Sequence, residues 1–140
     1  MGSDSTDRPP VRQLRLVVEA DDYESAVRFY RDVLGLEEEL SLAGPGGAHV
    51  TILAAGRATL EIVNARQKAY IDEVEVRRPV APRVRVAFEV VDAAATSEAL
   101  VAAGAELIAA PTETPWRSLN ARLGAPAGLQ LTIFEELGPD

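Results

Sequence analysis

A chain of 140 residues, 47% of them hydrophobic, is long enough for one compact domain and too short for two independent ones. It has no cysteine, which excludes disulfides, thiolate metal sites and cysteine nucleophiles, and its net charge of -8 disfavours binding to nucleic-acid phosphates. Residues 1–10 are polar and no charge-free stretch could span a bilayer, so we expect a soluble, cytoplasmic protein with a disordered tail and no membrane partner.

The first predicted elements are a strand and a helix. Residues 14–22 read LRLVVEADD, and their alternation predicts a strand with an apolar face and with Arg15 on the opposite face. Asp22 is a typical N-cap for a helix over residues 23–34, and Gly35 is suited to ending it in the left-handed conformation.

Three short β-like segments follow in the first half, and a charged segment comes after them. The segments are Glu37–Ala43, His49–Ala55 and Ala58–Val63. The run GPGGA at 44–48 lacks the following helix and Lys–Ser/Thr pair of a phosphate-binding loop, so it is interpreted as a hairpin turn. Residues 65–82 are charged and proline-containing, which predicts a connector that could lie over a site.

The same order of elements recurs 70 residues later. Residues 84–92 read VRVAFEVVD, which aligns Arg85 with Arg15 and Asp92 with Asp22. A helix ending at Gly104 and three further strands are predicted in this half: Glu106–Ala110, Ser118–Leu123 and Leu129–Phe134.

This repeated β-α-β-β-β order, with FYRDVLGL at 29–36 and RVAFEVVD at 85–92, resembles the vicinal oxygen chelate superfamily. That superfamily includes glyoxalase I, extradiol dioxygenases and the bleomycin-resistance drug-binding proteins. The resemblance implies an α+β fold with two tandem βαβββ modules whose mixed sheets form a cup, completed as a homodimer. The expected domain covers residues 11–136, with module one at 11–64, the connector at 65–82 and module two at 83–136.

The resemblance also implies where metal ligands would lie. It places Arg15 and Arg85 at positions usually held by His, Glu61 at a usual Glu, and Thr132 where a second Glu would stand. Strand alternation supports this mapping, because the neighbouring apolar residues share the opposite faces: Leu60, Ile62, Leu129, Leu131 and Ile133. A catalytic divalent metal needs about three His, Asp, Glu or Cys ligands, and arginines repel a dication. We therefore expect neither a metal nor another cofactor.

The roles of these polar residues are open on the sequence alone. Glu61 neutralises the two arginines in a partly buried cup, or an arginine donor stays free to bind a ligand, and both can hold at once. His49, the single histidine, is either an exposed wall residue or a general base. Trp116 either stacks on a flat ligand or packs at the rim or a dimer contact.

Further residues are expected to line the cup. Asn120 and Arg122 alternate along one predicted strand and share the parity of Thr132 and Phe134, whereas Phe88 is expected in the core. Tyr70 in the connector is a candidate lid residue.

These features favour a metal-independent small-molecule-binding protein that confers antibiotic resistance by sequestering a small hydrophobic or aromatic natural product, without catalysis. The alternative is an enzyme: a glyoxalase-like isomerase or lyase, a dioxygenase, or a metal-free relative with Glu61 or His49 as base. A third interpretation is a subunit whose filled cup serves only in assembly.

Overall fold

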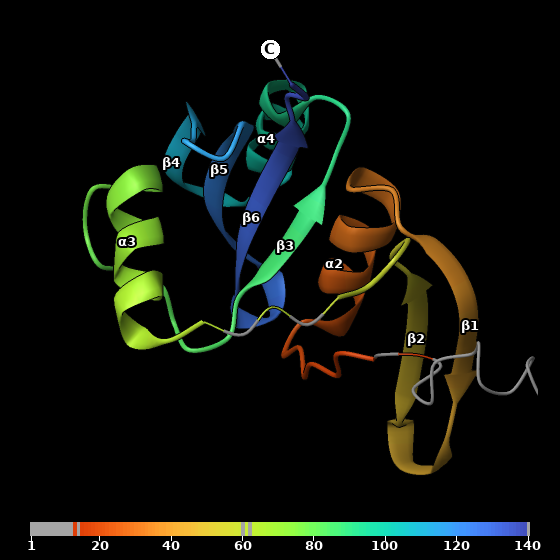
Figure 1. Cartoon of the computed structure of the whole chain (residues 1–140). Coiled ribbons are helices and arrows are strands. Elements are labelled where there is room, and N and C mark those ends of the chain that lie inside the picture. The colour runs from red at the N-terminus through yellow and green to blue at the C-terminus, as the bar shows by residue number, and fades with distance from the viewer. Residues whose placement is uncertain (1–12, 14, 60, 62, 140) are drawn as a thin grey trace, which may run out of the picture.

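The structure of the chain is a computed structural model that describes residues 13, 15–59, 61 and 63–139 (Figure 1). The expected tail at 1–10 lies outside the described residues. The helical elements are α2 (Tyr23–Val27), the π-helix η1 (Arg28–Val33) that directly continues it, the short 3-10 turns η2 (Pro45–Gly47) and η3 (Pro126–Gly128), α3 (Ala65–Glu75) and α4 (Ala93–Ala102). The strands are β1 (Glu37–Ala43), β2 (His49–Ala54), β3 (Val86–Glu89), β4 (Glu106–Glu113), β5 (Ser118–Ala125) and β6 (Leu129–Glu136).

The second half forms the predicted β-α-β-β-β unit. Its four strands make one sheet in the order β3-β6-β5-β4, in which β3 runs parallel to β6 and the other neighbours are antiparallel. Helix α4 follows β3 in the chain and begins after Asp92, whose carboxylate accepts the Ala95 N–H at 3.0 Å. The mixed α+β fold of the prediction is therefore present.

One face of the four-stranded sheet carries the hydrophobic core. Leu131 and Ile133 of β6 are fully buried there against Leu100 of α4 and against Phe29 and Tyr30 of η1. Phe88 packs against this cluster as a partly buried residue, which agrees with its expected place in the core. Alternation along β6 then turns the residues between these apolar positions toward the other face.

That other face is polar, and α3 covers it. Figure 1 shows α3 and α2 on opposite sides of the four-stranded sheet. Residues 65–82 were expected to be a connector, and this helix was not predicted. Its apolar pattern is weak because two of its three buried residues are the acidic Asp72 and Glu75, the third being Ile71. Asn64 caps its first turn by accepting the Gln67 N–H at 2.9 Å.

The first half departs from the prediction. β1 and β2 form an antiparallel hairpin around η2, as expected, but no strand is present at 15–22 or among the described residues of 58–63. A strand exists only where a neighbour takes up its backbone hydrogen bonds. The described residues of these segments have no such neighbour, and Val17 is 87% exposed. Leu14, Leu60 and Ile62 lie outside the described residues.

Within the described part of the chain, none of the helices has both the length and the apolar character that crossing a bilayer requires.

Candidate functional site

The polar face of the four-stranded sheet brings together four of the residues expected in the cup. In the strand register Arg122 of β5 lies opposite Thr132 of β6, and Asn120 lies opposite Phe134. Arg122, Thr132 and Asn120 are 0%, 2% and 6% exposed, and Phe134 is partly buried. Strand alternation alone places these four side chains on the face opposite the core, as the sequence predicted.

Arg122 is the centre of a buried ionic cluster. Its Nη1 donates to Asp72 Oδ1 at 2.8 Å and to Gln130 Oε1 at 2.9 Å, and its Nη2 donates to Glu75 Oε1 at 2.7 Å. Asn120 Nδ2 donates to the second oxygen of Glu75 at 2.7 Å. We call these five residues the Arg122 cluster. A buried guanidinium requires such partners, because an unpaired buried charge costs several kcal/mol, of order 3–5.

One donor of the Arg122 cluster is unused. The Nε–H of Arg122 is buried and donates to no acceptor among the described residues. Asp72 and Glu75 instead each bond to a terminal nitrogen, so neither carboxylate makes the side-on contact in which one carboxylate accepts from Nε and Nη2 together.

Asp72 also fixes the chain that follows α3. Its Oδ2 accepts the backbone N–H groups of Val80 and Ala81, both at 2.9 Å. Burial alone raises the pKa of the Asp72 carboxyl, but the hydrogen bonds from Ala81, Arg122 and Val80 outweigh that effect and bring the pKa below its usual value. The carboxylate is thus held in its charged form.

Arg85 lies beside this cluster and is only partly satisfied. Its Nη1 donates to the hydroxyl of Thr132, and its side chain is partly buried. Burial lowers the pKa of Arg85, and the nearby charge of Arg122 lowers it further, while Glu75, Glu61 and Asp72 act in the opposite direction. Among residues 13, 15–59, 61 and 63–139, no carboxylate lies within ion-pair distance of Arg85.

The expected grouping of Arg15, Glu61 and Arg85 is only partly formed. Glu61 is exposed and is close enough to act on the charge of Arg85. Arg15 is exposed, lies in no strand, and forms no ion pair within the described part of the chain. Its predicted position on the cup floor depended on a strand at 14–22, which the described residues do not form.

Two expected ligand residues meet at the edge of α3. The rings of Tyr70 on α3 and Trp116 in the β4–β5 loop have centroids 6.2 Å apart and are tilted by 55°. They are 47% and 43% exposed, so both rings keep free surface. The tilted arrangement is a common one for aromatic pairs.

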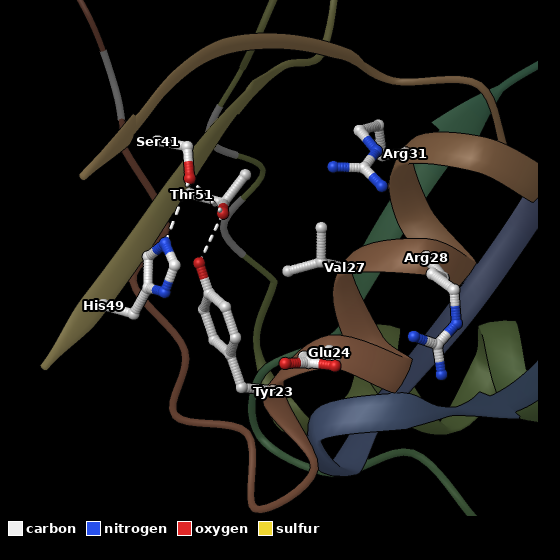
Figure 2. Close-up of a pocket in the computed structure, with 8 residues that line it drawn as sticks. All are labelled: Tyr23, Glu24, Val27, Arg28, Arg31, Ser41, His49 and Thr51. Carbon is white, nitrogen blue, oxygen red and sulfur yellow. Dashed lines mark hydrogen bonds between the residues drawn. The ribbon is translucent and has the colours of Figure 1, made fainter. Parts of the chain in front are cut away.

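His49 lines a pocket of about 260 Å³ between α2, η1 and the β1–β2 hairpin. Its ring stacks on Tyr23 with centroids 5.0 Å apart, and Nε2 lies 3.2 Å from Ser41 Oγ. Ser41 lies 3.4 Å from the Thr51 hydroxyl, which also bonds the Tyr23 hydroxyl. Figure 2 shows this polar group facing the arginines on the helix, with Val27 between them. The lining residues are Tyr23, Glu24, Val27, Arg28, Arg31, Ser41, His49 and Thr51. His49 is thus not on the polar face of the four-stranded sheet.

The residues at the expected metal positions do not fit a divalent metal. Arg85 and Arg15 are cations, the Thr132 hydroxyl is bonded to Arg85, and Glu61 is the single carboxylate of the set. Within the described residues there is also no group of three or more His, Cys, Asp or Glu side chains that could hold a metal ion. The donor set of this chain is suited to hydrogen bonding with organic groups instead.

Asp72, Glu75 and Gln130 were not predicted as members of the site. Asp72 and Glu75 stand three residues apart after a good N-cap, Asn64, and this spacing places both carboxylates on one face of a helix. That signal was available. It did not indicate a buried face, because an acidic helical face is usually solvated rather than buried.

Comparison with known proteins gives the family. The model of the glyoxalase-like domain matches residues 15–134, whereas among curated proteins none matches significantly. Similar solved structures include a glyoxalase/bleomycin resistance protein/dioxygenase from Nocardioides, with a TM-score of 0.51, 20% identity, and coverage of 99% of this chain and 92% of that chain. A glyoxalase-related enzyme from Fulvimarina pelagi has a TM-score of 0.54, 19% identity, and coverage of 90% and 89%. A hypothetical protein from S. aureus has a TM-score of 0.59, 12% identity, and coverage of 93% and 98%. At these identities the solved structures support the fold alone, while the match over residues 15–134 shows that the chain belongs to the glyoxalase-like domain family.

Proposed function

We propose that the chain is a metal-independent small-molecule-binding protein, and that it protects a cell by sequestering a toxic natural product on the polar face of its four-stranded sheet. The observation that carries this proposal is Arg85. Its partly buried guanidinium bonds the Thr132 hydroxyl and has no carboxylate within ion-pair distance in the described chain. A guanidinium has five N–H donors, so Arg85 retains donors for a carbonyl, hydroxyl or carboxylate of a ligand.

The other residues of the polar face and of α3 support this role. Asp72 and Glu75 pair with Arg122, so Arg85 is the cation of this face that has no carboxylate within ion-pair distance in the described chain. Tyr70 on α3 and Trp116 beside it add half-exposed aromatic surface, which suits a hydrophobic or aromatic ligand. Relatives of this fold carry names that include bleomycin resistance, which is consistent with drug binding.

The tandem modules and the homodimer belong to the same proposal. Leu40, Leu42 and Val50 of the β1–β2 hairpin are 43%, 53% and 46% exposed, an apolar surface that pairing with a second copy would bury. The first-half strands expected at 14–22 and 58–63 would then find their partners in the dimer. Sedimentation analysis tests this: a monomer at all protein concentrations contradicts the dimer.

Ligand binding is tested with Arg85 and a matched control. A thermal-shift screen of aromatic natural products identifies a stabilising compound, because a ligand of the folded state raises its stability. Arg85→Gln should weaken binding of that compound by about tenfold to a hundredfold, the range expected for a charge-assisted hydrogen bond. Arg83→Gln removes an exposed arginine two residues earlier and should leave the affinity unchanged.

The compound should be recovered chemically unchanged, and chelation of metals should not alter its affinity. Turnover of the compound, or equal affinities of the Arg85→Gln and Arg83→Gln proteins, would contradict the proposal.

A second candidate function is a metal-free enzyme, which the hydrogen-bonded group at His49 favours. Ser41, Thr51 and Tyr23 connect to His49 beside a pocket, an arrangement that can hold or move a proton. If the pocket is catalytic, His49→Gln abolishes turnover of any substrate found, and Ser41→Ala reduces it. Unchanged turnover in both variants would remove this candidate.

A further inference from the structure

We propose that the natural product bound on the polar face carries two carboxylate groups, and that it binds by displacing α3 from Arg122. This inference rests on the proposed binding function of the same face. In the structure α3 supplies the two carboxylates itself, so Asp72 and Glu75 occupy the positions that the ligand would take.

The chemistry of the face defines this ligand class. Two guanidiniums lie on this face, from Arg122 of β5 and from Arg85 just before β3, together with the side-chain amide of Asn120. The carboxylates that pair with Arg122 come from α3, outside the sheet. Without α3 the face therefore has two positive charges and an excess of donors, which is complementary to an acceptor-rich dianion.

α3 is attached to the sheet mainly through polar contacts. Ile71 is the buried apolar residue of α3, and it is not a member of the hydrophobic core cluster formed by the described residues. Release of α3 would thus leave the core between the sheet, α4 and η1 intact. The end of the helix is also held in a conformation unusual for its sequence, since Arg77 has a φ of 69°.

The unused donor of Arg122 gives a free carboxylate an advantage over α3. The Nε–H of Arg122 is buried without an acceptor among the described residues. A ligand carboxylate can accept from Nε and Nη2 at once, the bidentate geometry that Asp72 and Glu75 do not use. The ligand would thereby satisfy the donor that α3 leaves without a partner.

The net charge of -8 does not oppose this local preference. Charges separated by more than about 8 Å are largely screened at physiological ionic strength. The two guanidiniums on the same face act on the ligand at contact distance, so they favour a negatively charged ligand.

The test uses glutarate as the probe, with butyrate and glutaramide as analogues that have one carboxylate and none. Glutarate should bind more tightly than either analogue in titration calorimetry. It should also change the emission of Trp116, the single tryptophan, because displacement of α3 removes Tyr70 from its ring. Hydrogen exchange should become faster in the amides of α3 when glutarate is bound.

Variants of α3 separate displacement from simple binding. Glu75→Gln weakens the attachment of α3 and should tighten glutarate binding by about tenfold, because apparent affinity rises with the fraction of molecules in the open state. Glu73→Gln makes the same change at an exposed position of the same helix and should leave affinity unchanged. Tyr70→Ala, which removes the ring contact with Trp116 without changing charge, should also tighten binding. Circular dichroism establishes that each variant is folded.

The outcomes distinguish this inference from the proposed function. Tighter binding by Glu75→Gln and Tyr70→Ala, with faster exchange in α3, supports both. If natural products bind but glutarate does not, or if glutarate binds equally well to the Glu75→Gln and Glu73→Gln proteins with α3 still protected, the inference is overturned and the binding function stands. If no compound binds to any of these proteins, both are overturned.

Discussion

Replacement of Arg122 by leucine should destabilise the fold severely. The side chain is fully buried and bonds the carboxylates of Asp72 and Glu75 at 2.8 and 2.7 Å. Its loss leaves two negative charges buried without their cation, and removal of one partner of a buried ion pair costs about 3–5 kcal/mol. Since single domains are stable by only about 5–15 kcal/mol, this is a large share of the total.

Urea denaturation measures this loss. With a slope of about 2 kcal/mol per molar urea, the midpoint of the Arg122→Leu protein should fall by roughly 2 M. Arg31 is the matched control, because it also bonds two carboxylates, Asp32 and Glu38, at 2.8 and 2.9 Å but on the surface. Arg31→Leu should therefore lower the midpoint much less, since water already solvates its partners.

A further variant identifies the origin of the loss. Adding Asp72→Asn and Glu75→Gln to Arg122→Leu removes the stranded charges, and the new amide side chain at position 72 would retain an oxygen for the N–H groups of Val80 and Ala81. Most of the lost stability should return. A loss below about 1 kcal/mol for Arg122→Leu, or a loss equal to that of Arg31→Leu, would refute the reasoning that burial makes this cluster expensive to break.

Three other predictions concern stability and ionisation. The pKa of Asp72 is lowered in the folded state, so its contribution to stability is present above about pH 4 and is lost as the pH falls further. Asp72→Asn should therefore make the free energy of unfolding, measured by urea denaturation, depend less on pH in the acid range. Burial raises the pKa of Tyr30 to about 12, and a late step near that pH in an absorbance titration should disappear in Tyr30→Phe. That variant also removes the 2.8 Å bond to the carbonyl of Pro126 and should lose about 1 kcal/mol of unfolding free energy, whereas an unchanged titration would contradict the assignment. Asp92→Ala removes the acceptor for the Ala95 N–H at the start of α4 and should cost about 0.5–2 kcal/mol in thermal or urea unfolding, with no loss if water replaces the cap fully.

The second half of the chain was predictable because each of its elements carries a local signal. Alternation in β6 placed Leu131 and Ile133 in the core and Thr132 on the other face, and the structure agrees. The predicted caps of α4 are also present, since the Asp92 carboxylate accepts the Ala95 N–H and Gly104 after the helix has a φ of 113°. Such signals involve residues close in sequence, which is why one sequence suffices to find them.

The elements that were predicted wrongly or not predicted depend on contacts between residues that are distant in the sequence. The strand predicted at 14–22 has the right alternation, but alternation cannot supply the neighbouring strand that a β-strand needs. The helix α3 was not predicted because its buried side chains Asp72 and Glu75 are acidic rather than apolar. Their burial is explained by ion pairs with Arg122, which lies some fifty residues further along the chain. The pairing of Tyr70 with Trp116 follows from the same helix and was equally hidden.

The Arg122 cluster also restricts which substitutions can accumulate at its positions during evolution. Since one guanidinium pairs with two carboxylates, a lineage that loses the arginine first passes through an intermediate with two unpaired buried carboxylates. Positions 72, 75 and 122 are therefore expected to vary together when homologous chains are aligned. A homologue without the arginine should have neutral residues in place of Asp72 and Glu75 on α3.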